Sequence, residues 1–217
     1  MTLISLISAI MLNSATLPND RYQDCLTMLD ADLDVGRRIA KQWVSDNGGP
    51  DAYHCLAIAD LKAGFPKLAA IRLTETAERE DAGDALVRAR VYAQAANAWL
   101  IAEFPGEARR VLDAAFTLAP DAGELYLTDA KVAYAQERWG DVIKAVTAAS
   151  EKDFHSTEVY VLRARVHRRL GNLEFAAEDI VTALTLDPYN VDALVVRGEL
   201  QQAGITIEVT YELPDDN

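Results

Sequence analysis

The feature that most constrains the fold is a pattern of residues that recurs every 34 positions. In the segment 160–188, YVLRARVHRRLGNLEFAAEDIVTALTLDP, an aromatic residue opens the pattern, small residues hold fixed places inside it and a proline closes it. The recurring columns are Tyr92, Tyr126 and Tyr160; Ala96, Ala130 and Ala164; Ala108, Val142 and Ala176; Ala115, Ala149 and Ala183; and Pro120, Phe154 and Pro188. A fixed period of this length indicates an array of structural repeats.

A more divergent unit lies upstream of these three. It stands 39 residues before the next one, and its matching residues are Tyr53, Ala57, Ala69, Leu73 and Thr76. The extra residues fall in REDAGD, residues 79–84, where a longer loop adds little to the entropy lost on folding. The sequence therefore predicts units at 22–48, 50–82, 89–121, 123–154 and 157–188, and a final helix at 191–203.

Each unit has the periodicity of two helices. Tyr160, Ala164 and His167 are spaced by four and three residues, so they share one helix face. Gly171 can adopt the left-handed conformation that ends a helix. Ala176, Ile180 and Ala183 then share a face of a second helix, which ends before Pro188 because the residue before a proline is disfavoured in helical geometry. One such hairpin cannot bury its own apolar face, so the units must stack.

These residues resemble the tetratricopeptide repeat (TPR), whose pattern runs from a large aromatic through small residues to a closing proline. The resemblance covers residues 22–203, although Asp129 and Arg163 replace a Leu of that pattern and Phe154 replaces one proline. It implies an all-α, right-handed α-solenoid with a short extended segment at its C-terminal end. The first helix of each pair would line an inner groove.

The resemblance also implies which side chains face this groove. They form three rows: His54, Ala93, Leu127 and Val161; Ile58, Asn97, Lys131 and Arg165; and Leu61, Leu100, Tyr134 and Arg168. Asn97, Lys131, Arg165 and Arg168 make a polar, basic row beside an apolar strip of Leu100, Leu127, Tyr134 and Val161. Because arginine binds carboxylates through two parallel hydrogen bonds, we expect an extended peptide ligand with acidic groups. Alternatively, the basic residues of RARVHRR, 163–169, lie on a solvated helix face.

The N-terminal residues have the character of an export signal. The apolar stretch Thr2–Leu12 has the length of a signal-peptide core and is too short to span a membrane, although no Lys or Arg precedes it. The sequence therefore predicts a signal peptide and linker over 1–19, no integral membrane span, and a periplasmic or secreted protein. The alternatives are a helix that caps the solenoid and a cytoplasmic protein.

The two cysteines occupy matching places in adjacent units. Cys25 lies three residues after Tyr22, and Cys55 lies two residues after Tyr53. First helices of neighbouring units pack side by side in such arrays, so we expect a disulfide, with two buried thiols as the alternative. The stretches CLTMLDADLD and HCLAIADL also resemble the start of exported bacterial TPR proteins that carry such a Cys pair.

The C-terminal tail, residues 204–217, changes to a different periodicity. In ITIEVTYEL, 205–213, apolar and polar residues alternate strictly, which is typical of a strand. Gly204 can supply a turn that folds this segment back over Leu194, Val195 and Leu200 at the end of the array. The rival interpretation is pairing with a strand of another copy or of a partner.

The sequence contains no pattern that indicates catalysis, a cofactor or a metal site. His54, His155 and His167 do not stand at metal-ligand spacing, and His54 and Cys55 point about 100° apart on a helix. A net charge of −13 opposes binding to nucleic acid or anionic membranes. We therefore expect a non-catalytic scaffold, monomeric, that binds a protein or peptide. The alternatives are a self-assembling structural subunit that uses the solenoid end and terminal strand, and an enzyme or metal protein that uses His54 and Cys55.

Overall fold

The computed structural model describes residues 18–208, with side chains from residue 21 onward. The predicted signal core Thr2–Leu12 and residues 209–217 lie outside these residues. Eleven helices occupy the described residues: α1 (Pro18–Ala31), α2 (Leu33–Ser45), α3 (Gly49–Lys62), α4 (Pro66–Glu78), α5 (Ala85–Ile101), α6 (Pro105–Leu118), α7 (Gly123–Ala135), α8 (Trp139–Glu151), α9 (Thr157–Arg169), α10 (Leu173–Leu186) and α11 (Val191–Gln202). None of them is both long enough and apolar enough to cross a membrane.

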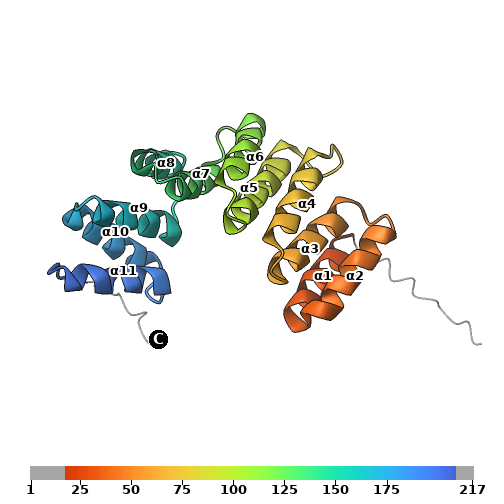
Figure 1. Cartoon of the computed structure of the whole chain (residues 1–217), viewed down its shortest axis with the longest axis horizontal. Coiled ribbons are helices and arrows are strands. Elements are labelled where there is room, and N and C mark those ends of the chain that lie inside the picture. Colours follow the sequence, from red (N-terminus) through yellow and green to blue (C-terminus); the bar gives the residue numbers. More distant parts are fainter. Residues whose placement is uncertain (1–17, 209–217) are drawn as a thin grey trace, which may run out of the picture.

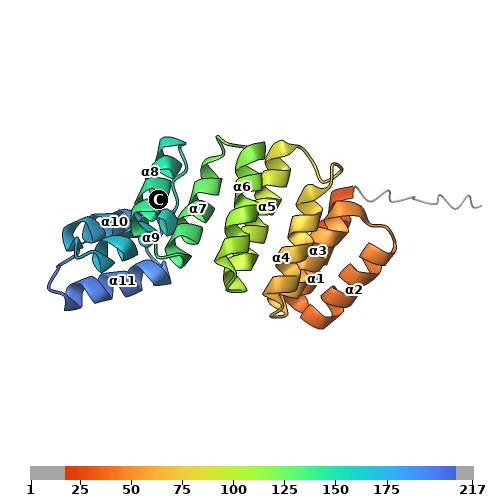
Figure 2. The ribbon, with the colours of Figure 1, turned by 45° about the horizontal axis from the view of Figure 1, so that its top comes forward.

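Consecutive helices pack as hairpins, α1 with α2 and so on to α9 with α10, and each hairpin contacts the next. The first helices of the later units also contact one another, α5 with α7, α7 with α9 and α9 with α11. Figure 1 shows the hairpins following one another along an arch, and Figure 2 shows the same row in a second view. The predicted all-α solenoid is confirmed.

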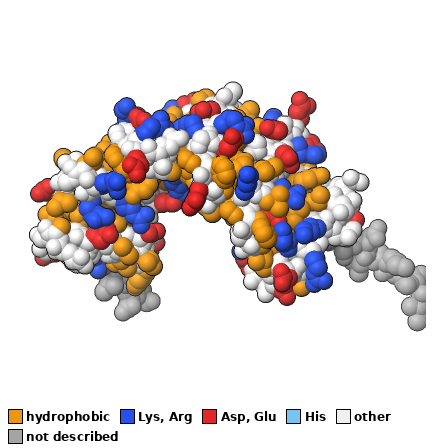
Figure 3. All heavy atoms as spheres, viewed as in Figure 1, with side chains coloured by type: hydrophobic (Ala, Val, Ile, Leu, Met, Phe, Trp, Pro, Cys, Tyr) orange, Lys and Arg blue, Asp and Glu red, His pale blue; other side chains and the backbone are white. Residues whose placement is uncertain are grey.

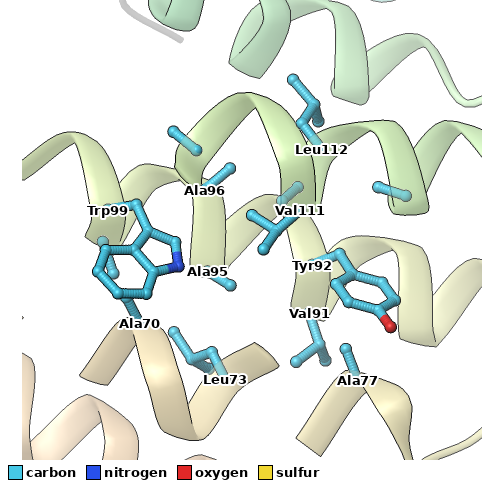
Figure 4. Close-up of a cluster of buried hydrophobic side chains, with 14 of the residues drawn as sticks. Ala70, Leu73, Ala77, Val91, Tyr92, Ala95, Ala96, Trp99, Val111 and Leu112 are labelled. Carbon is cyan, nitrogen blue, oxygen red and sulfur yellow. The ribbon is translucent and has the colours of Figure 1, made fainter. Parts of the chain in front are cut away.

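The repeat columns form the contacts between helices. Ala96, Ala130 and Ala164 of the first helices are completely buried, as are Ala108, Val142 and Ala176 of the second helices. Figure 4 shows how one of these contacts is made: Val91, Ala95 and Trp99 of α5 point toward Ala70, Leu73 and Ala77 of α4. Small side chains let the helices approach, and larger ones fill the remaining space.

The turn after the first helix uses the left-handed backbone conformation in every unit from the second onward. The residues at this place are Gly64, Glu103, Glu137 and Gly171, with φ angles of 81°, 65°, 56° and 80°. The predicted left-handed conformation of Gly171 is therefore confirmed. Because two of the four residues are glutamates, the hairpin contacts are strong enough to hold a non-glycine residue in this conformation.

The cysteines join the first two units. Cys25 of α1 and Cys55 of α3 form a disulfide with a Cα–Cα distance of 6.5 Å, and both are buried in a cluster with Leu29 and Trp43. This separation is within the usual range for disulfides. The bond fixes the first described hairpin, which packs against one other unit among residues 18–208, to α3.

We expect Cys25→Ala/Cys55→Ala to lower the free energy of unfolding by about 2–4 kcal/mol, because the cross-link restricts the unfolded chain. Urea denaturation followed by circular dichroism would measure the difference. Adding reductant should destabilise the wild type by a similar amount and leave the double variant unchanged. Equal stability of the oxidised protein and the double variant would contradict this role.

The described part of the tail, 205–208, folds back onto the last helices. Gly204 has a φ of 88°, and the Ile205 N–H donates to the Leu200 carbonyl oxygen at 3.0 Å. Ile207 is only 7% exposed in a cluster with Val196, while Glu208 is exposed. The tail thus supplies apolar cover to α11, which has no second helix after it among the described residues. Residues 205–208 belong to no helix or strand, and the rest of the predicted strand lies outside the described residues.

The tail covers only part of the surface that the sequence predicts. Leu194 packs against the cluster and Leu200 is fully buried, but Val195 remains 52% exposed. Adjacent residues point about 100° apart on a helix, so Val195 lies on a different side of α11 from Leu194.

Ile207→Ala should lower the free energy of unfolding by about 2 kcal/mol, since it removes buried apolar contacts. Thr206→Ala, at the exposed neighbouring position, is the matched control and should have little effect. Deletion of 205–217 should lower the melting temperature and leave the protein monomeric in sedimentation. A truncated protein that is equally stable, but has lost a dimer present in the parent, would assign the tail to pairing between chains.

Candidate functional site

A long groove in the described residues runs across the first helices of three units and the start of the final helix. Its volume is about 630 Å³, and its lining residues are Asn97, Leu100 and Ile101 of α5; Lys131, Tyr134 and Ala135 of α7; Glu158, Val161, Leu162 and Arg165 of α9; and Asn190 and Asp192 before and in α11. Figure 3 shows the units curving around this open side of the molecule, with basic and acidic side chains both present along it. We call this surface the inner groove.

Six of the eight predicted groove residues line this surface. They are Asn97, Leu100, Lys131, Tyr134, Val161 and Arg165. Leu127 does not line it, because its side chain packs into the core formed by α7, α8 and α9. Arg168 lies beyond its edge and forms an ion pair with Glu199 at 3.2 Å. The apolar strip is therefore shorter than predicted, and Leu127 supports it from below.

The basic residues of the inner groove are all paired, which the sequence does not predict. Lys131 Nζ lies 2.8 Å from a carboxylate oxygen of Glu158, and Arg165 forms an ion pair with Asp192. Each pair links a cation of one unit to a carboxylate at the start of the next first helix. The inner groove thus has a balanced charge in place of the predicted basic row.

The carboxylates that pair with Lys131 and Arg165 belong to a column of residues that recurs along the array. Glu124, Glu158 and Asp192 stand 34 residues apart, each as the second residue of its helix, and the same column holds Arg90 in the second turn of α5. Carboxylates at a helix start are stabilised by the helix dipole. Because this role is enough to explain their presence, the sequence alone does not assign them to the groove. The same 34-residue spacing that identifies the core columns could have identified this one as a groove row.

Asn97 connects two neighbouring first helices at one end of the inner groove. Its Nδ2 donates to the Ala93 carbonyl oxygen at 3.0 Å and to Thr128 Oγ1 at 3.5 Å. At the floor, Tyr134 packs edge-on against Trp139 with ring centroids 5.2 Å apart. These contacts hold both side chains in position, so the polar end and the apolar floor are formed before any ligand arrives.

A smaller pocket of about 280 Å³ lies at the N-terminal end of the array and includes Tyr22, His54 and Gln94. Tyr22 Oη lies 2.7 Å from His54 Nδ1, and His54 Nε2 lies 2.5 Å from Gln94 Oε1. Because an amide oxygen can only accept, a neutral His54 in this arrangement carries its proton on Nε2 and accepts from Tyr22 at Nδ1. Burial, followed by the Asp51 carboxylate, raises the pKa of the Tyr22 phenol, which keeps this donor protonated.

His54 and Cys55 do not form a reactive pair. Cys55 is committed to the disulfide with Cys25, so its sulfur is available neither as a nucleophile nor as a thiolate ligand. His155 stacks on Tyr160, and His167 lies beside Phe175. Among the described residues, no group of three His, Cys, Asp or Glu side chains is placed to hold a metal ion. With Cys55 held in the disulfide, the described structure offers no free thiol beside His54 for the alternative that uses this pair.

No family model matches the chain, and no curated protein matches it. Solved structures match it over most of its length. A thermophilic TPR protein from Thermus thermophilus shares 17% identity at a TM-score of 0.67, over 86% of this chain and 100% of that one. MamA from Desulfovibrio magneticus, from residue 41, shares 15% identity at a TM-score of 0.61, over 80% of this chain and 97% of that one.

A third similar structure is YrrB, described as a TPR protein with an unusual peptide-binding site. It shares 15% identity at a TM-score of 0.56, over 82% of this chain and 90% of that one. At such identities the likeness concerns the backbone. The chain folds as a TPR solenoid.

Proposed function

We propose that the chain is a non-catalytic scaffold that binds an extended segment of a partner protein in the inner groove. The observation that carries this proposal is the groove itself, which crosses α5, α7, α9 and the start of α11 and has an apolar floor between polar rims. Concave surfaces of this size, mostly apolar with a few placed polar groups, are typical ligand sites. YrrB, whose backbone is similar, is described as having a peptide-binding site, which agrees with this proposal.

The ion pairs of the inner groove allow a ligand with carboxylates to bind by exchange. Glu158 and Asp192, the partners of Lys131 and Arg165, have side chains that are 58% and 68% exposed. Exposed pairs of this kind contribute at most about 1 kcal/mol, so little stability is lost when one is opened. A ligand carboxylate can therefore replace Glu158 or Asp192 while the displaced side chain turns into solvent. This exchange retains the predicted acidic ligand, although the groove is not basic.

We expect acidic peptides to bind, and Arg165→Glu to weaken binding by about tenfold, a loss of roughly 1.4 kcal/mol. Asp192→Asn should tighten binding several-fold, because it frees Arg165 without removing it. The probe is a set of peptides selected on the disulfide-intact protein from a library of random 16-residue sequences. Fluorescence anisotropy of the labelled peptides would give the dissociation constants.

The matched control is Arg110→Glu, which makes the same charge change on α6. Arg110 pairs with Glu107 within that second helix, away from the inner groove. If Arg165→Glu and Arg110→Glu change peptide affinity equally, the effect is one of net charge and the groove assignment is wrong. Failure of every selected peptide to depend on either Arg165 or Tyr134 would likewise contradict the proposed function.

The location that we propose is the bacterial cell envelope. It is supported by the signal-like segment Thr2–Leu12 and by the buried disulfide, because disulfides persist in oxidising compartments. The full chain, produced in a bacterium with its own N-terminus, should then enter the periplasm. Its intact mass there should show loss of the N-terminal segment and of two hydrogens. Cytoplasmic protein that keeps the segment and has two thiols would refute the envelope location.

The alternative, a self-assembling subunit, is favoured by one observation at the C-terminal end. Tyr189, Val191 and Val195 are exposed there; Tyr189 lies in the turn between α10 and α11, and Val191 and Val195 lie on α11. Sedimentation of the full chain over a wide concentration range separates the two functions. A single monomeric species supports the scaffold, whereas a mass that grows with concentration supports the assembly.

A further inference from the structure

A second apolar surface lies on the edge of the array, where units two and three meet. Its residues, which we call the edge patch, are between 36% and 60% exposed: Phe65, Leu68, Ile71, Ile101 and Phe104. A pocket of about 470 Å³ opens among them, between the α3–α4 turn, the first turns of α4 and Ala102. Apolar side chains gathered in this way on a surface mark interaction sites more often than isolated ones do.

The other units show that the fold does not require these apolar residues. The second helices begin at Pro66, Pro105, Trp139 and Leu173, which sets the correspondence between units. The place of Leu68 is held elsewhere by Glu107, Asp141 and Phe175; that of Ile71 by Arg110, Lys144 and Glu178; and that of Ile101 by Lys62, Ala135 and Arg169. All units share one packing scheme, so charged residues are compatible with it at each of these places. The shared packing scheme therefore does not require Leu68, Ile71 and Ile101 to be apolar, whereas Phe104 also packs edge-on against the core residue Trp99.

The edge patch is continuous with the inner groove. Ile101 lines the groove, and the next residue, Ala102, lines the pocket of the patch. Both lie at the C-terminal end of α5, where the chain turns toward Phe104. In the following unit the corresponding turn is Gln136-Glu137-Arg138, which is polar. An apolar path thus leads out of the groove at this unit and is interrupted at the next.

The edge patch also has a cation that is available to a ligand. Lys67 is exposed, its Nζ lies 4.8 Å from the centre of the Phe104 ring, and it forms no ion pair within residues 21–208. Arg37 stacks over Phe65, but its guanidinium is committed to the buried Asp60. A ligand with a carboxylate beside its apolar side chain would complement this site.

We infer that the edge patch is a second anchor for the ligand of the inner groove, an inference that rests on the proposed function. A ligand segment that leaves the groove past Ile101 places an apolar side chain among Phe65, Leu68 and Ile71. A neighbouring Asp or Glu of the ligand then meets Lys67. The partner segment is thus extended, with two apolar anchors and acidic residues next to the second one. A chain of 16 residues, up to about 50 Å when extended, is long enough to join two such sites.

The test uses Leu68→Glu/Ile71→Lys, which gives unit two the residues that units three and four tolerate. Glu107 with Arg110 and Asp141 with Lys144 form ion pairs at this spacing, so the variant should fold with an unchanged melting temperature. Its net charge equals that of the wild type. Phe175→Glu, a change in the same column of unit five, is the matched control.

The probes are the 16-residue peptides selected on the full, disulfide-intact chain, together with versions shortened from either end to the smallest that still binds. We expect the double variant to bind the 16-residue peptides at least about tenfold more weakly than the wild type, as expected when a buried apolar anchor is lost. It should bind the shortened peptides with unchanged affinity. Phe175→Glu should change neither, and Arg165→Glu should weaken both lengths.

Equal binding of the long peptides by the double variant and the wild type would overturn the second anchor. If Arg165→Glu still weakened binding in that case, the groove function would stand alone. If the wild type sedimented as a dimer and the double variant as a monomer, the patch would belong to a second copy of the chain, which also overturns the inference. Absence of any peptide that depends on Arg165 would remove both proposals together.

Discussion

The whole array depends on the close approach of helices at columns of small residues. Ala96, Ala130 and Ala164 are completely buried at the helix contacts of three successive units. A longer side chain there would force the helices apart or out of their preferred rotamers, because protein interiors are already close-packed. Since each unit contacts only its neighbours, this one contact is repeated along the chain and its geometry sets the curvature of the arch.

This constraint also decides which residues are free for binding. Side chains that point away from the helix contacts are less constrained by packing, and the inner groove collects several of them from three units and the start of α11. In a chain of net charge −13, the groove residues Lys131 and Arg165 keep carboxylates of their own chain as partners. These exposed pairs add little to stability. A charged ligand can therefore open them and pair with Lys131 or Arg165 through its own carboxylate.

The sequence predicts the fold well because the fold is repeated. Any one unit departs from the pattern, whereas the set of units reveals the columns, and the tail turn at Gly204 follows from the same logic. The partners of the groove side chains are harder to predict from the sequence, because they depend on the small rotation between neighbouring units. Lys131 and Glu158 are 27 residues apart and meet only after that rotation is known. The column pattern places Leu127 in the groove, yet α8 and α9 enclose it.

The differences between units carry the remaining information. A position that holds the same kind of residue in all units is required by the fold. A position that differs in one unit has a role that is specific to that unit. At the N-terminal end the departure is the Cys25–Cys55 bond, and at the C-terminal end it is Ile207 in place of a second helix. Both departures secure the two ends of the array within residues 18–208, where helices pack against a neighbour on one side. Ile71 departs in the middle of the array, where neighbours are present on both sides, so stability of an end cannot explain it. An apolar side chain placed where the fold accepts a charge is best explained by a contact outside the chain. Ile71 lines a pocket together with Ala102, the neighbour of Ile101, so that contact would lie at the exit of the inner groove.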